Sequence, residues 1–362
     1  MSFRTRRILK TTPLFMIMEY IVLRYLLSLF SVTNDIMLIP MVLILGAMQC
    51  VPMLFEEKKS TRTGRFVSTL FGIWEWVFVM LLIYLAVIFI VEYFIRIPPA
   101  VLSLILLTIP AIGAYAYINA HRIVVKERTL VFDNLKKEYN IIHISDVHFG
   151  SIRHEKIIRD ITSKIQELTD NSDIVVISGD LADGSCVIEE DDFMEFKKVN
   201  IPIIFTSGNH DYYPGLENVH KACKKAGMII LENQGTTYGN LNIYGLSFSF
   251  DDIEMPTTEQ LKAFIDKDKI NIVNYHVPTG WDALSEIGFD IQLSGHTHGG
   301  QFYPAVWLGN FFYGGYNMGL FKRRINDSKH YLHVTTGVGI MDFPMRWGTN
   351  SEIVVLRLRK TQ

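Results

Sequence analysis

Four long apolar runs in the first third of the 362-residue chain constrain its fold more than any other feature. They cover residues 14–32, 36–55, 70–95 and 97–119. A helix needs about 20 apolar residues to cross the roughly 30 Å hydrocarbon core of a bilayer, and each run is about that long. Buried core helices are the alternative, but their sequences are usually shorter and more amphipathic. We therefore expect residues 1–122 to form an all-α bundle of four transmembrane helices.

Basic residues flank these runs unequally, which predicts the orientation of the bundle. Eight of them precede the first run or lie between the second and third: Arg4, Arg6, Arg7, Lys10, Lys58, Lys59, Arg62 and Arg65. The opposite side carries only Arg96, and the link at 33–35 has no base. Because basic flanks stay on the cytoplasmic side, we expect a multi-pass protein of the cell (inner) membrane with its C-terminal part in the cytoplasm. Three widely spaced cysteines fit that reducing compartment: Cys50, Cys186 and Cys223.

One basic residue lies inside the first apolar run and needs a partner there. Arg24 could pair with Glu19 on the same helix or with Glu75 in the third run. A structural role and a role in holding a substrate both remain open.

The sequence from residue 123 to 362 alternates short β-branched runs with charged, helix-like segments, which predicts an α/β domain. The expected strands lie at 140–145, 173–178, 201–206, 241–246, 270–276, 289–295, 330–336 and 352–358. Between the first two, residues 153–168 place isoleucines on one helical face. A net charge of −2 argues against binding to nucleic acid.

Side chains that can bind metals follow five of the expected strands. They are Asp146 and His148, then Asp180, then Asn209 to Asp211, then His276, and finally His296 and His298. Loops at the carboxyl ends of strands converge on one place in open α/β sheets. Each residue alone is more often structural than functional. Together they supply carboxylates, an amide and imidazoles, a mixture that suits Mn²⁺, Fe or Zn²⁺.

The order of these motifs resembles that of the metallophosphoesterase (calcineurin-like phosphoesterase) superfamily: DVH, GD, GNHD, a single histidine and GHTH. The longer form LSGHTHGGQ (293–301) is similar to a membrane-associated bacterial branch, and the tail supports this through YNMGLF (316–321) and the segment 334–358. That branch includes UDP-2,3-diacylglucosamine pyrophosphatase-type phosphodiesterases. The resemblance covers about residues 127–362 and implies a four-layer αββα sandwich with two divalent metals, Mn²⁺ foremost.

The resemblance also implies a role for each motif residue. One metal would be bound by Asp146, His148 and His298. The other would be bound by Asn209, His276 and His296, with Asp180 bridging the two. A hydroxide held between the metals would attack phosphorus. His210 would protonate the leaving group, and Asp211 would fix its tautomer.

The segment 302–324 is rich in aromatics and ends in three bases, and it has two interpretations. It could be sandwich core followed by a solvated basic turn. Alternatively it forms a lip, with Trp307 and Phe311 at the lipid headgroups and the bases Lys322, Arg323 and Arg324 on anionic lipid or substrate phosphate.

The expected partners are the lipid bilayer and a lipid-linked phosphodiester or pyrophosphate substrate. Two other functions stay open: a membrane-tethered phosphodiesterase or phosphatase acting on a soluble or protein substrate, and a non-enzymatic metal-binding signalling module. A transporter is disfavoured because four spans with few ionisable residues offer little polar pathway.

Overall fold

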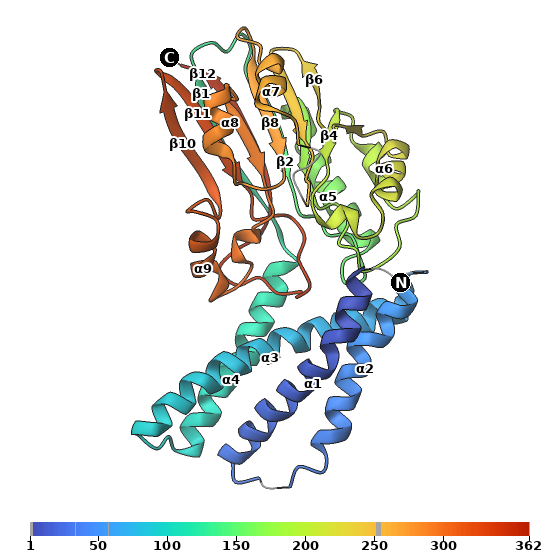
Figure 1. Ribbon diagram of the computed structural model, residues 1–362, viewed down its shortest axis with the longest axis vertical. Coiled ribbons are helices and arrows are strands. Elements are labelled where there is room, and N and C mark those ends of the chain that lie inside the picture. Colours follow the sequence, from blue (N-terminus) through green and yellow to red (C-terminus); the bar gives the residue numbers. More distant parts are fainter. Residues whose placement is uncertain (1–2, 33, 57, 251–254, 362) are drawn as a thin grey trace.

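The computed structural model describes residues 3–32, 34–56, 58–250 and 255–361. A helical part is followed by a part built on two β-sheets (Figure 1). Thr33 of the predicted first link and the side chain of Arg4 lie outside the described residues.

The helical part consists of four helices that correspond to the four predicted runs. They are α1 (Phe3–Leu29), α2 (Leu38–Glu56), α3 (Arg62–Phe94) and α4 (Pro99–Ala120). By length and hydropathy, all four can cross a membrane. Large apolar side chains such as Ile44, Ile90 and Leu104 point away from the protein on their surfaces. Exposed apolar area on this scale would be unfavourable in water, so it fits contact with lipid.

The basic residue of the first helix has a partner other than the two predicted ones. The Nε of Arg24 lies 3.3 Å from Oδ2 of Asp35, in the link to α2. Glu19 accepts a hydrogen bond of 2.5 Å from Nε1 of Trp74 in α3. Arg24 therefore holds the α1–α2 link, and Glu19 joins α1 to α3.

Two mixed six-stranded sheets form the second part. The first has the order β1-β12-β2-β3-β4-β5, with β1 (Ile123–Phe132), β12 (Ser351–Lys360), β2 (Tyr139–Ile144), β3 (Ile174–Ser178), β4 (Ile203–Thr206) and β5 (Ile229–Ile230). The second has the order β10-β11-β9-β8-β7-β6, with β10 (Gly319–Ile325), β11 (Ser328–Val334), β9 (Ile291–Ser294), β8 (Ile270–Tyr275), β7 (Leu241–Leu246) and β6 (Gln234–Tyr238).

Helices cover the outer faces of the sheets, which gives the predicted αββα sandwich. The remaining helices are α5 (Glu155–Gln166), α6 (Leu216–Lys225), α7 (Thr258–Phe264), α8 (Trp281–Ile287) and α9 (Ala305–Phe312), with 3-10 turns at Thr169–Asn171, Met194–Lys198, His210–Tyr212 and His298–Gly300. Isoleucines of α5 and Val219 of α6 pack on the first sheet, and Leu261 of α7 and Leu284 of α8 pack on the second. The core between the sheets is aliphatic, as Ile141 and Ile272 illustrate.

All eight predicted strands are present, and four further strands lie outside the predicted runs. The additional strands are β1, β5, β6 and β10. All four are edge strands: β1 and β5 flank the first sheet, and β10 and β6 flank the second. Their outward faces need no apolar alternation, so the sequence pattern is weak there.

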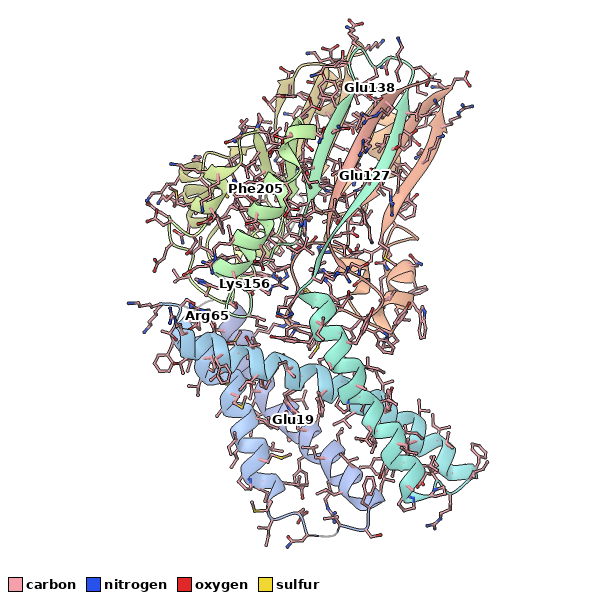
Figure 2. All side chains as sticks on the ribbon, turned by 180° about the vertical axis from the view of Figure 1, so that it is seen from behind. Glu19, Arg65, Glu127, Glu138, Lys156 and Phe205 are labelled. Atoms are coloured by element: carbon pink, nitrogen blue, oxygen red, sulfur yellow. The ribbon has the colours of Figure 1, made fainter. Side chains whose placement is uncertain are left out.

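The two parts are joined by buried contacts near the end of α4. The Asn119 side chain donates to the carbonyls of Arg346 and Thr349, and the Arg153 guanidinium donates to the carbonyl of Ala120. Trp76 of α3 is buried against Phe302, with ring centroids 6.4 Å apart. From behind, Arg65 lies at this junction, whereas Glu138 lies at the far end of the sandwich (Figure 2).

Candidate metal centre

The predicted site residues follow strands β2, β3, β4, β8 and β9, which end at the edge of the sandwich that faces the helices (Figure 1). Most of them are buried, and Asn209, His210 and His296 are partly exposed. The structure brings all seven predicted ligands together in two adjacent groups.

The first group contains Asp146, His148 and His298. The two imidazoles face each other, with Nε2 of His148 3.0 Å from Nε2 of His298. Oδ1 of Asp146 lies 3.3 Å from Nε2 of His298 and 3.8 Å from Nε2 of His148. All three donor atoms therefore converge on one point.

The second group contains Asp180, His276 and His296, with Asn209 beside them. Nε2 of His276 lies 3.1 Å from Oδ2 of Asp180 and 3.2 Å from Nδ1 of His296. Oδ1 of Asn209 is 2.9 Å from the same Nδ1 of His296. The amide that was predicted as a ligand is therefore in reach of this group.

Asp180 lies between the two groups. Its Oδ2 atom is 3.1 Å from His276 Nε2 in the second group and 3.7 Å from His148 Nε2 in the first. Its Oδ1 atom accepts a hydrogen bond from the backbone N–H of His210. One carboxylate oxygen is thus placed where it can reach an ion in either group.

These distances fit a pair of bound metals. Two ligands about 2.1 Å from one ion, at angles of about 90–109°, lie about 3.0–3.4 Å apart. The closest contacts within each group span 2.9–3.3 Å, which is in this range. Two imidazoles also gain little from facing each other unless they share an ion or a proton. The donors are imidazole, carboxylate and amide, which Mn²⁺, Fe and Zn²⁺ all accept, so the site fits two divalent ions without selecting one of them.

In the second group, the charge of the Asp180 carboxylate favours a protonated His276. Burial acts to lower the pKa of His276, but the Asp180 carboxylate outweighs it and raises that pKa to about 9. Burial, together with the charge on His276, lowers the pKa of His296 to about 4. Because a histidine must be neutral to bind a metal, loading this group releases the His276 proton.

Unusual backbone conformations aim the ligands. Five of the seven predicted ligand residues have left-handed φ angles: Asp146 (53°), His148 (49°), Asp180 (53°), His296 (70°) and His298 (51°). Such a conformation costs an L-residue about 1–2 kcal/mol, and it persists only where the surroundings enforce it. The strain is therefore concentrated at the strand ends that carry the ligands.

Glycines admit the close contacts that these turns require. A Cβ atom on Gly295 would collide with the Ser145 hydroxyl and the Asp146 carboxylate. A Cβ on Gly208 would collide with the Asp180 carboxylate. Glycine at these two positions therefore lets the backbone pass close to the site.

His210 lies beside the first group, but Asp211 is not its orienting partner. The rings of His210 and His148 have centroids 4.8 Å apart, and Nδ1 of His210 is 3.1 Å from the carbonyl oxygen of Asp183. The Asp211 carboxylate instead accepts the backbone N–H groups of Asp180, Ala182 and Gly208. Asp183 therefore fixes the tautomer of His210, and Asp211 holds the loops around Asp180.

Arg346 supports the site and was not among the predicted residues. Its guanidinium is fully buried and donates to the carbonyls of Thr336 and Gly339 at 2.7 and 2.8 Å. It also approaches the carbonyl of His298 at 3.5 Å, and its own backbone N–H donates to Ala116 of α4. Burial lowers its pKa to about 10, so it stays charged near neutral pH. Its place between the two runs of the tail segment 334–358, outside any metal-binding motif, gave no signal of this role in the sequence.

The proposed aromatic lip is split by the structure. Helix α9 lies at the edge of the sandwich nearest the helices (Figure 1), and its Trp307 and Phe311 are 71% and 83% exposed. The bases of β10 are separate from it. Arg323 binds Asp282 at 2.6 Å, whereas Lys322 and Arg324 alternate with it along the strand. Trp307 and Phe311 are therefore not sandwich core, and the three bases do not form one cluster.

Comparisons with known proteins agree with this site. Residues 139–300 match the family described as calcineurin-like phosphoesterase. Over 270 residues, 32% are identical to an uncharacterized metallophosphoesterase of Campylobacter jejuni, covering 71% of this chain and 69% of that protein. An uncharacterized metallophosphoesterase of Helicobacter pylori is 29% identical over 65% of this chain and 63% of its own length. A Danio rerio transmembrane protein with metallophosphoesterase domain is 27% identical over 61% and 53%, respectively.

The position of Asp180 between the groups predicts different effects for two substitutions. Asp180→Asn should lose both metals, because one carboxylate serves the pair. His210→Gln should keep both metals and slow turnover of an aryl phosphodiester by about 10²–10⁴-fold, the usual effect of losing a general acid. Metal content per chain by elemental analysis, with rates in parallel, tests this.

Two distant substitutions serve as controls. Asp191→Asn changes an exposed carboxylate and His330→Gln changes a histidine that contacts the carbonyl of Phe289. Both should keep full metal content and rate. A metal-free His210→Gln protein would show that His210 is a ligand and refute the division of roles.

Proposed function

The chain belongs to the calcineurin-like metallophosphoesterase family, and we propose that it hydrolyses a lipid-linked phosphodiester or pyrophosphate while anchored in the cell membrane. The proposal rests on the position of the two metal-binding groups relative to the helices. Both metal-binding groups are at the edge of the sandwich that faces four candidate membrane helices (Figure 1). A substrate held in the bilayer could reach the site without leaving the bilayer.

In this proposal the chain has two domains with separate tasks. Residues 1–122 form the membrane anchor and residues 123–362 form the catalytic domain. The contacts of Asn119 and Arg346 hold the two together. The relative named as a transmembrane protein with metallophosphoesterase domain supports this combination.

The residues divide into metal ligands and a proton donor. We assign Asp146, His148 and His298 to one ion, Asn209, His276 and His296 to the other, and Asp180 to both. When bound, the two ions supply an activated water nucleophile and neutralise charge on the phosphoryl oxygens. Mn²⁺ is the ion we favour, with Fe or Zn²⁺ as alternatives.

His210 is placed to act on the leaving group. It lies outside both metal groups yet directly beside His148. Donation from Nδ1 to the Asp183 carbonyl fixes the ring. The proton delivered to the departing oxygen would therefore come from Nε2 of the doubly protonated ring, which is left neutral with its hydrogen on Nδ1. Asp211 contributes indirectly, because its three backbone hydrogen bonds position the Asp180 carboxylate.

A lipid extract tests the proposed substrate class directly. Purified full-length protein with Mn²⁺ is incubated with membrane lipids, and lipid species are quantified by mass spectrometry. We expect one phosphate-containing lipid to disappear, and no change with Asp180→Ala. Hydrolysis of water-soluble nucleotide pyrophosphates with the whole lipid fraction unchanged would contradict a lipid substrate.

The charge bias around the helices predicts a cytoplasmic catalytic domain. With eight bases on one side against one on the other, the positive-inside rule places the site in the cytoplasm. Fusions of green fluorescent protein and of alkaline phosphatase after Gln362 measure this. Fluorescence without phosphatase activity is expected, and the reverse pattern would overturn the orientation.

The exposed aromatics of α9 should contribute to binding of a lipid substrate. Trp307→Ser with Phe311→Ser removes roughly 1.5–3 kcal/mol of apolar burial per side chain if lipid covers them. We expect a higher KM for a lipid-linked substrate and unchanged turnover of a soluble diester. Ile229→Ser, at an exposed apolar side chain of β5, is the control. Equal loss of both activities in the double variant would refute a lipid-contacting lip.

A further inference from the structure

A cavity of about 450 Å³ lies between the helices and the metal centre. Its walls come from both parts of the chain: α1, α2 and α3 on one side, and the loops around His210 on the other. The cavity thus begins at the residue that we assign as proton donor and extends to the helices.

Both walls of the cavity mix apolar and polar side chains. On the helical side, Ile8 of α1, Met48 and Met53 of α2, and Phe71 of α3 lie among polar residues. Those polar residues are Arg7, Thr11, Gln49, Ser68 and Glu75. The sandwich side combines polar groups, His210 among them, with Ile152, Met341 and Phe343. A cavity that brings apolar helix side chains and polar groups together beside His210 can take an amphiphile.

The helical residues that line the cavity lie at the end of the bundle next to the sandwich. They come from the first turns of α1, the last turns of α2 and the first turns of α3, which lie at the ends next to the sandwich (Figure 1). Thr12 of α1 donates to Gln49 of α2 at 2.9 Å, so the two helices are joined beside the cavity. In a membrane these helix ends lie near the headgroups, where a lipid phosphate would be found.

The volume sets how much of a ligand fits. Ligand sites of about 300–1,000 Å³ enclose molecules of drug size. A cavity of about 450 Å³ can hold a headgroup with the glycerol-like region next to it, but not two long acyl chains. The chains of a bound lipid would have to remain outside, among the helices or in the bilayer.

We propose that this cavity binds the part of a lipid substrate that adjoins its phosphate, in a membrane phosphoester whose scissile phosphoryl group lies beside His210. The inference rests on the proposed function and adds that α1, α2 and α3 form part of the substrate site. The substrate would come from the bilayer along these helices, and Met48, Met53 and Phe71 would contact the apolar segment next to its phosphate.

Filling the cavity from the helical side tests this. Met48→Trp and, independently, Met53→Trp add bulk to the helical side of the cavity. Met41→Trp is the matched control, because Met41 is on the same helix and 38% exposed, outside the cavity lining. Full-length proteins are compared in phosphatidylcholine nanodiscs.

Two substrates with the same leaving group separate binding from chemistry. One is a long-chain diacylglycerol p-nitrophenyl phosphodiester, and the other is soluble bis(p-nitrophenyl) phosphate. We expect Met48→Trp and Met53→Trp to lower kcat/KM at least 10-fold for the lipid diester and to stay within twofold of the unmodified protein for the soluble one. Met41→Trp should change neither.

The outcomes distinguish this inference from the function on which it rests. If both filling variants cleave the lipid diester as well as Met41→Trp does, or if they lose both substrates equally, the cavity is not the lipid site. If the unmodified protein cleaves only the soluble diester, the cavity inference fails while phosphoesterase activity stands. Failure to cleave either substrate with Mn²⁺ would refute the proposed function itself.

Discussion

The left-handed turns after β2, β3 and β9 are the constraint on which the site depends, because they direct carboxylates and imidazoles to two shared points. Such turns are costly for L-residues, and buried hydrogen bonds hold them in place. Asp211 accepts three backbone N–H groups around the Asp180 turn, and Arg346 donates to carbonyls of the loops that adjoin His298. These hydrogen bonds hold the predicted ligand side chains together before any metal binds.

The same buried groups connect the site to the helices. Arg346 supports the loops near His298 through its side chain and contacts Ala116 of α4 through its backbone. Trp76 of α3 packs on Phe302, which is four residues after the end of the GHTH motif. A helical part that only tethered the enzyme would not need contacts this close to the ligands. The structure thus favours a helical part that shapes the site over one that only tethers it.

Features that depend on local sequence patterns could be predicted from the sequence. Apolar length identified all four helices, β-branched runs identified eight strands, and the residues after those strands identified the seven clustered side chains. Edge strands such as β6 and β10 were missed because their exposed faces weaken the alternation. Asp211 lies next to His210 in sequence, yet tertiary packing directs its carboxylate to the loops around Asp180. The cavity could not be predicted either, since it forms only where α1, α2 and α3 meet the sandwich.

A crystal structure of the metal-loaded protein, with anomalous scattering at the edge of the bound metal, tests the account most directly. It should show two ions about 3.5–4 Å apart, with Asp180 bridging them, Asp146, His148 and His298 on one ion, and Asn209, His276 and His296 on the other. A single ion, two ions more than about 6 Å apart, or a His298 side chain turned away from both would contradict it.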